Sequence, residues 1–354
     1  MRRRRPLLPR LHRWVGVGLA AWLVLVALTG GLLLWSDAWL RFRLPGDLPA
    51  ATQAWPAPGT VARLLAAAPG PVATLELPRP AAPWGKLYLA DGGEWLVHPE
   101  TGVRLAEHAP ATSAVAFVFA LHARLLAGET GRTIVGSLGL LLAATLLAGL
   151  ALWLRRRRAF DLRRVAVSEV TPQAVLRSHV AQGVLASALL LAVALTGLTL
   201  ALGGEGPMRP TVVERAGPPG APDWAAVLAA GRAAFPEGRL TFLAPPAAPA
   251  GVAVLRVRTP AELHPGGRSY AVVDPVTGAL LERIDTGARG LGPAVLDVLW
   301  PLHAGRTGWF GHRWVLLGAA FVLLRLVTTS LWLQSDRRAR RRRLAALAAG
   351  RAEG

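Results

Sequence analysis

Four histidines of this chain fall into two pairs with matching sequence around them. His12 is followed seventeen residues later by Thr29 in the sequence Ala-Leu-Thr-Gly, and His179 is followed seventeen residues later by Thr196 in the same four residues. Such a match at a fixed spacing indicates a duplication, in which related residues occupy the same place in each half of the fold. We therefore expect the imidazoles of His12 and His179 at the same depth.

The second pair consists of His122 and His303, each within Leu-His-Ala just ahead of a long apolar run. An arginine follows each of them ten residues later, at Arg132 and Arg313. Two imidazoles at matched depth, facing a common axis through an apolar bundle, are what bis-histidine ligation of a b-type haem requires. Polar groups inside a membrane are costly and tend to be functional. The pattern predicts one or two b-type haems with these iron ligands: His12, His179, His122 and His303.

Other assignments of the histidines stay open. A single histidine at the end of a span often snorkels to the interface or caps a helix, and ligation could pair histidines within each half instead of between halves. His312, nine residues after His303, competes with it as the outer ligand. The remaining histidines lack the spacing of metal ligands, and we expect them to be exposed to solvent: His98, His108 and His264.

Four arginines lie near these histidines or within a span, and with His312 they complete the predicted cofactor-binding residues. Arg13, Arg132 and Arg313 could neutralise haem propionates or could contact lipid phosphates. Arg325 lies inside the last apolar run between leucines, where a charge needs a partner such as a propionate or a carboxylate. Snorkelling of Arg325 towards the cytoplasm is the simpler alternative.

The composition places the chain in a membrane. Hydrophobic residues make up 53% of the sequence, and four apolar runs of about 20 residues are each long enough to cross a hydrocarbon core of roughly 30 Å. Because the number of runs is even, both termini are expected on one side. The predicted spans are 14–36, 133–154, 180–202 and 313–334.

The formal charge of +19 is concentrated in three short segments at the ends of these spans. Residues 1–13, 155–178 and 335–354 hold 20 of the 40 basic residues but only 4 of the 21 acidic ones. The positive-inside rule places such segments in the cytoplasm, so we predict cytoplasmic termini in a bacterial inner membrane, with two periplasmic segments. Nucleic-acid binding is disfavoured as the reason for the charge, whereas contact with membrane lipids follows from it.

The two long segments outside the spans are similar to one another. Each has a helix candidate and alternating strands that meet at Pro-x-Thr-Gly, at 99–102 and 275–278, where proline and glycine favour a turn. Each segment is therefore predicted to be a small α+β module. The full division is a basic N-terminus at 1–13, a first span at 14–36, a first module at 37–112, an interfacial helix and second span at 113–154, a basic linker at 155–178, a third span at 179–202, a second module at 203–293, an interfacial helix and fourth span at 294–334, and a basic tail at 335–354.

These features resemble the PepSY-associated transmembrane family over nearly the whole chain. The resemblance rests on Leu-His-Arg-Trp at 11–14, the Ala-Leu-Thr-Gly of the first span, the two Pro-x-Thr-Gly hairpins, and Leu-His-Ala-Gly at 302–305 before a span rich in tryptophan and arginine. It implies a mainly α membrane protein with four transmembrane helices in two parallel repeats, each with a small α+β periplasmic PepSY-like module.

The family resemblance also implies a role in iron uptake, because members include haem-containing ferric-siderophore reductases. The implied activity is that of an oxidoreductase, which transfers electrons through haem to a periplasmic ferric siderophore or other iron chelate. The electron donor would be quinol or a separate cytoplasmic reductase, since the linker around 155–164 is short and carries no flavin or nucleotide domain. The alternative is a cofactor-free, membrane-anchored PepSY protein that binds a peptide or protease partner.

The sequence argues against several other chemistries. It has no cysteine, which excludes disulfides, thiolate metal sites and iron–sulfur clusters. A glycine-rich dinucleotide motif, a His-Glu-x-x-His pair and a Gly-x-Ser-x-Gly elbow are all absent, so a nucleotide site and a membrane protease are disfavoured. A transporter is disfavoured because no span carries the paired acidic residues or the broken-helix signals that coupling sites usually show.

Overall fold

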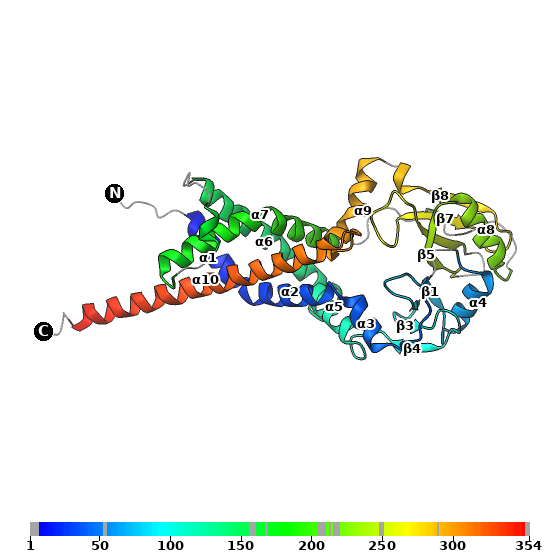
Figure 1. Cartoon of the computed structure of the whole chain (residues 1–354), viewed down its shortest axis with the longest axis horizontal. Coiled ribbons are helices and arrows are strands. Elements are labelled where there is room, and N and C mark those ends of the chain that lie inside the picture. The colour runs from blue at the N-terminus through cyan, green and yellow to red at the C-terminus, as the bar shows by residue number, and fades with distance from the viewer. Residues whose placement is uncertain are drawn as a thin grey trace. The chain divides into compact units, whose positions relative to one another are not determined.

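The computed structural model describes residues 7–51, 55–155, 161–166, 169–203, 210–211, 214, 220–247, 251–288 and 290–350. The predicted basic residues at 2–5 and 156–158 lie outside these ranges. Contacts within the chain divide it into two compact units, whose helices and strands are labelled in Figure 1. The helical unit comprises Met1–Leu32, His122–Leu202 and Gly311–Gly354, and the sheet unit comprises Leu33–Leu121 and Gly203–Phe310.

Three helices of the described chain are long and apolar enough to cross a membrane: α6 (Gly128–Arg155), α7 (Pro172–Gly203) and α10 (Gly311–Gly350). A fourth span is present if α1 (Leu7–Gly18) and α2 (Ala20–Leu33), which meet at a bend of 56°, cross together. Three predicted spans lie within α6, α7 and α10, and the first falls mainly on the bent pair. The chain is therefore a multi-pass membrane protein.

The bend between α1 and α2 is not predicted by the apolar run. It follows Gly16 and Gly18, and glycine both lowers helix propensity and is common where helices kink. Leu19, at the bend itself, is buried in a core that also contains Leu190 of α7 and Leu323 of α10. Packing of this side chain against the neighbouring helices stabilises the bent geometry.

Small residues let the membrane helices approach one another closely. A Cβ added at Gly136 of α6 would lie 2.8 Å from the Leu202 side chain of α7, so only glycine fits there without a shift. At Gly139, one turn further along α6, an added Cβ would lie 3.8 Å from Leu198, which is an ordinary contact. Close packing at small residues is typical of helix association in membranes.

The sheet unit is built on one eight-stranded antiparallel sheet with the strand order β4-β3-β2-β1-β5-β6-β7-β8. The strands are β1 (Val72–Glu76), β2 (Gly85–Leu89), β3 (Glu94–Val97), β4 (Arg104–Glu107), β5 (Arg239–Ala244), β6 (Ala253–Arg258), β7 (Ser269–Val273) and β8 (Leu280–Ile284). The Pro-x-Thr-Gly turns join β3 to β4 and β7 to β8. Gly102 and Gly278 have φ angles of 74° and 72°, which confirms the predicted turn chemistry.

Both predicted modules contribute to this single sheet, which the sequence did not indicate. β1 pairs with β5, for example at Leu75↔Leu243. Helices α4 (Pro58–Ala66) and α8 (Trp224–Ala234) pack on one side of the sheet and against each other (Figure 1). One hydrophobic core therefore includes residues of both segments.

Three further helices begin or lie in the sheet unit: α3 (Ser36–Arg43), α5 (Ala114–Arg124) and α9 (Leu291–Ala304). Two short 3-10 turns, η1 (Leu162–Arg164) and η2 (Thr286–Ala288), complete the described elements.

Asp37 of α3 binds two arginines from distant parts of the sheet unit. Its carboxylate accepts hydrogen bonds from Arg79 at 2.9 and 3.0 Å and from Arg306 at 2.6 Å. Burial by itself would raise the pKa of Asp37, but the hydrogen bonds from Arg79 and the charge of Arg306 outweigh it and hold that pKa below its ordinary value. The ionised carboxylate thus ties α3 to the segment that follows α9.

Candidate functional site

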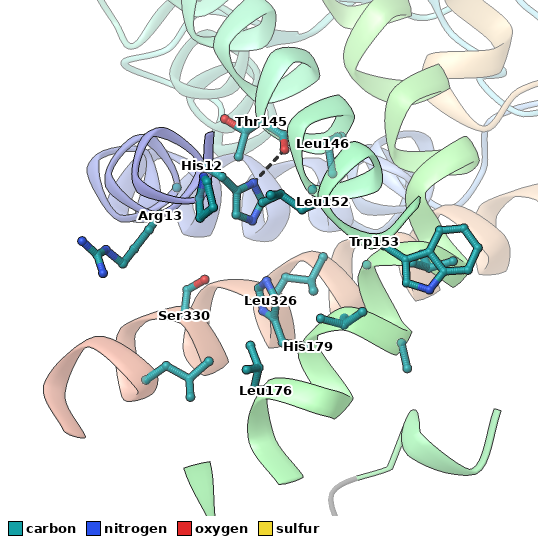
Figure 2. Close-up of a pocket in the computed structure, with 18 of the residues that line it drawn as sticks. His12, Arg13, Thr145, Leu146, Leu152, Trp153, Leu176, His179, Leu326 and Ser330 are labelled. Atoms are coloured by element: carbon teal, nitrogen blue, oxygen red, sulfur yellow. Dashed lines mark hydrogen bonds between the residues drawn. The ribbon is translucent and has the colours of Figure 1, made fainter. Parts of the chain in front are cut away.

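His12 and His179 lie next to one another in the helical unit. His12 is on α1 and His179 is on α7, and their ring centroids are 6.4 Å apart with the ring planes at 73°. Figure 2 shows the two imidazoles reaching one pocket from these two helices. The structure therefore brings the first predicted pair together.

The protein orients both imidazoles through their Nδ1 atoms. His12 Nδ1 lies 3.0 Å from the backbone carbonyl of Thr145, which can only accept, so this nitrogen carries a proton. His179 Nδ1 lies 2.9 Å from the hydroxyl of Thr329, which itself donates to the Arg325 carbonyl at 2.8 Å. That hydroxyl therefore accepts from His179. In both neutral rings the lone pair is left on Nε2.

The two Nε2 atoms of His12 and His179 could act as two ligands of a metal whose other ligands come from a flat macrocycle. Within the described chain neither Nε2 has a hydrogen-bond partner, and a neutral imidazole anchored through Nδ1 is the form that binds metals. Two imidazole–metal bonds of about 2 Å and the radius of each ring place trans centroids roughly 6 Å apart, close to the 6.4 Å found here. Among the described residues, no three His, Cys, Asp or Glu side chains gather as ligands for a bare ion.

A cavity of about 600 Å³ adjoins the two imidazoles. Its wall is largely apolar and comes from α1, α6, α7 and α10, and Figure 2 shows Leu146, Leu176 and Leu326 in it. A cavity of this size and character is typical of a site for a mostly apolar ligand. Guanidinium groups that can neutralise ligand carboxylates line it as well. They belong to Arg10, Arg13, Arg164, Arg177 and Arg337.

Glycines shape this cavity at positions that the sequence interpretation missed. Gly16 and Gly183 line it, each four residues after a histidine and therefore on the same helix face. An added Cβ would lie 3.9 Å from Thr145 at Gly16 and 3.8 Å from Leu326 at Gly183, which are ordinary contacts, so a methyl group would fit at either position. Gly149 instead contacts the ring of His12, since a Cβ there would lie 2.9 Å from Cε1. The repeated His-x-x-x-Gly is the sequence signal that could have found the first two.

His122, from the second predicted pair, is half-buried on α5. Its Nδ1 lies 2.9 Å from the hydroxyl of Thr29, which donates to the Leu25 carbonyl at 2.7 Å, so His122 donates to Thr29. A Cβ added at Gly30 would lie 3.1 Å from His122 Cε1. The Ala-Leu-Thr-Gly motif of α2 therefore supplies both an anchor and the space for this imidazole.

The structure does not test the predicted assignment of the outer ligands. His303 is half-buried on α9 and belongs to the sheet unit, so its pairing with His122 stays a prediction. His312, the predicted competitor, is buried near the start of α10.

The four predicted arginines occupy different surroundings. Arg13 lines the cavity beside His12 and His179, and its contact with a propionate stays a prediction. Arg132 forms an ion pair with Glu129 at 2.6 Å near the start of α6. Arg313 and Arg325 are half-buried on α10, and their contact with a cofactor stays a prediction.

The expectation of solvent exposure is wrong for His264, which is 6% exposed. Its ring packs against Trp300 at 5.1 Å, and its backbone N–H donates to the Asp297 carboxylate of α9. Burial, and after it the charges of neighbouring arginines, lowers the pKa of His264 to about 3. His98 and His108 are half-buried.

The comparison with known families agrees with the arrangement of these elements. A family model described as the PepSY-associated TM region matches residues 9–337 of the chain. That range includes every residue of the cavity around His12 and His179. Among curated proteins, none matches the chain.

Proposed function

Because the chain belongs to the PepSY-associated TM family, we propose that it is a haem-containing electron-transfer protein of the bacterial cytoplasmic membrane. His12 and His179 would bind the iron of one b-type haem through Nε2. The protein would use this haem to reduce periplasmic ferric chelates, such as ferric siderophores, for iron uptake. The observation that carries the proposal is the 6.4 Å spacing of two imidazoles whose Nδ1 atoms are already anchored.

The residues around the cavity have separate roles in this proposal. A bound b-type haem supplies reversible one-electron transfer. The Thr145 carbonyl and the Thr329 hydroxyl hold the two imidazoles in the form that ligates through Nε2 and raise the basicity of that atom. Arg13 and Arg177, which line the cavity, would neutralise propionates, and the apolar part of the wall would exclude water from the ligands.

The surroundings of the two imidazoles support two parallel repeats. His12 is anchored on the carbonyl of Thr145, and Leu326 lines the same cavity beside His179. Thr145 and Leu326 each follow the histidine of the Leu-His-Ala motif in their own half by 23 residues. Related positions of the two halves therefore contribute to the same cavity.

We infer a second b-type haem with His122 and His303 as ligands, and His312 as the competing ligand. The contact of His122 Nδ1 with Thr29 supports this assignment, because it leaves His122 in the same tautomer as the first pair. Two haems at two depths would let electrons cross the bilayer in two short steps.

The direction of transfer follows from the charge pattern. The arginine-rich segments support cytoplasmic termini, so the sheet unit would lie in the periplasm. Electrons from quinol or a cytoplasmic reductase would then pass outward to a ferric chelate. Siderophores hold ferric iron far more tightly than ferrous iron, so the gain of one electron by the chelate releases the metal.

Absorption spectra of the purified protein, oxidised and then reduced with dithionite, test the proposal. We expect a Soret band and sharp reduced α and β bands, with an equal loss of haem in His12→Ala and His179→Ala and no loss in His98→Ala. Reduced wild-type protein should be reoxidised by a ferric siderophore with one electron taken up per iron. A stable but colourless protein would refute the proposal and would favour the rival, a membrane-anchored binding or regulatory protein without a cofactor.

A further inference from the structure

A second cavity lies within the sheet unit, among residues of α3, β3, β4 and the start of α5. Its volume is also about 600 Å³. Trp35, Trp39 and Phe42 contribute aromatic rings to its lining, and Leu96 and Leu105 contribute aliphatic chains. This size and lining are typical of sites for small, largely apolar ligands. The lining contains none of the residues proposed to bind haem.

His108 contributes a buried hydrogen-bonding atom that the protein leaves unused. Its Nδ1 is buried and has no partner among the described residues. A buried polar atom without a hydrogen bond is unfavourable, so a ligand that bonds it gains affinity. Neighbouring polar groups are already engaged: the Thr112 hydroxyl donates to the Glu107 carbonyl at 3.1 Å, and the Glu107 carboxylate pairs with Arg104 at 3.2 Å.

His108 is also uncharged at neutral pH. Burial, and after it the positive charge of Lys86, lowers the pKa of His108 to about 4. Lys86 itself pairs with Glu94 at 2.5 Å. The backbone N–H of His108 donates to the Glu94 carbonyl at 2.7 Å, which holds the residue at the end of β4. At this buried position the cavity offers a neutral hydrogen-bonding group rather than a charge.

In the sequence, the segments that line this cavity lie next to apolar helices of the helical unit. α3 begins at Ser36, soon after α2 ends at Leu33, and α5 ends at Arg124, shortly before α6 begins at Gly128. Tryptophans such as those in the lining are typical of the membrane–water interface. Because Trp35 follows α2 after only one residue, the order of the chain favours a lipid-soluble molecule as the ligand.

We propose that this cavity binds the ring of a lipid-soluble quinone. Such a ring is flat, uncharged and largely apolar, it packs on indole rings, and its oxygen atoms can bond the Nδ1 of His108. A phospholipid headgroup is disfavoured because the cation of the lining, Arg43, is exposed and Glu107 lines the same cavity. The inference goes beyond the haem site, since binding of the ring requires neither haem nor iron.

Binding of a short-chain ubiquinone to the detergent-solubilised full-length protein tests this inference. We expect saturable binding of one quinone per chain, weakened roughly tenfold by Trp39→Leu and by His108→Leu, with partial recovery in His108→Gln. The matched control is Trp309→Leu, which changes an exposed tryptophan of the same unit outside the cavity lining and should leave binding unchanged.

A photoreactive quinone provides a test that needs no variant to fold. It should label wild-type protein within residues 35–44 or 105–115 or at Leu96, and excess ubiquinone should prevent the labelling. Labelling elsewhere, binding that does not saturate, unchanged affinity in both variants, or equal competition by phosphatidylglycerol would overturn the inference. Haem content measured in the same samples separates the two proposals, because quinone binding by a haem-free protein contradicts only the haem site.

Discussion

Replacement of Gly149 by alanine is expected to displace one haem ligand while the fold is retained. An added Cβ lies 2.9 Å from Cε1 of His12, and ordinary van der Waals contact begins at 3.4 Å, so the ring must move by about 0.5 Å. Overpacking of this kind costs about 1–3 kcal/mol. If this strain acts on the iron–imidazole bond, the equilibrium for ligation weakens roughly 5- to 140-fold.

Carbon monoxide binding to the reduced protein measures this displacement. A bis-histidine haem is closed to carbon monoxide, whereas an iron that has lost His12 is open, so Gly149→Ala should gain carbon monoxide binding and lose part of its sharp α band. Gly139→Ala is the control, because it adds the same methyl group to the same helix at an ordinary distance of 3.8 Å from Leu198. A Gly149→Ala protein that stays closed to carbon monoxide, with the wild-type spectrum, would refute His12 as a ligand.

Three further changes test other parts of the structure. Gly183→Leu adds a bulky side chain to the cavity wall, so haem measured as its pyridine complex should be lost almost completely while stability changes by less than about 1 kcal/mol. Full haem content would contradict the assigned cavity. Asp37→Asn leaves the guanidinium groups of Arg79 and Arg306 short of a counter-charge and should lower the unfolding free energy by about 3 kcal/mol. Asp336→Asn, in an exposed ion pair, should lower it by less than about 1 kcal/mol. Equal losses on thermal unfolding would contradict the role of the buried ion pairs of Asp37. The pKa of His264 is about 3 in the folded protein, against an ordinary value of 6.5. Between these pH values the unfolded chain binds one proton at His264 that the folded protein does not bind. The free energy of unfolding therefore falls by about 1.4 kcal/mol per pH unit as the pH decreases from 6.5. His264→Gln should remove this part of the slope in hydrogen exchange of the sheet unit at pH 6.5 and 5, and an unchanged slope would show that His264 is not buried.

The sequence predicts those features that depend on local chemistry or on the duplication. The membrane helices are visible because a span needs about 20 apolar residues whatever its neighbours are. The turns at Gly102 and Gly278 are visible because proline and glycine set the backbone angles locally. The approach of His12 and His179 was predicted from the matching sequence around them.

Features that depend on contacts between distant segments were not visible. The pairing of β1 with β5 joins strands more than 150 residues apart, and nothing in either strand specifies the other. His264 appears polar and exposed in the sequence, but Trp300 and Asp297 of α9 enclose it. The glycine four residues after each cavity histidine could be read from the sequence, but only the structure shows that Gly16 and Gly183 line the cavity.

Low-temperature electron paramagnetic resonance of the oxidised protein in membranes tests most directly whether His12 and His179 share one iron. Their ring planes meet at 73°, and nearly perpendicular axial imidazoles leave two iron d orbitals almost equal in energy, so the spectrum should contain a highly anisotropic low-spin ferric component. His12→Ala and His179→Ala should each remove this same component. The account would be contradicted if the spectrum had no low-spin ferric component, or if no such component were lost in both His12→Ala and His179→Ala.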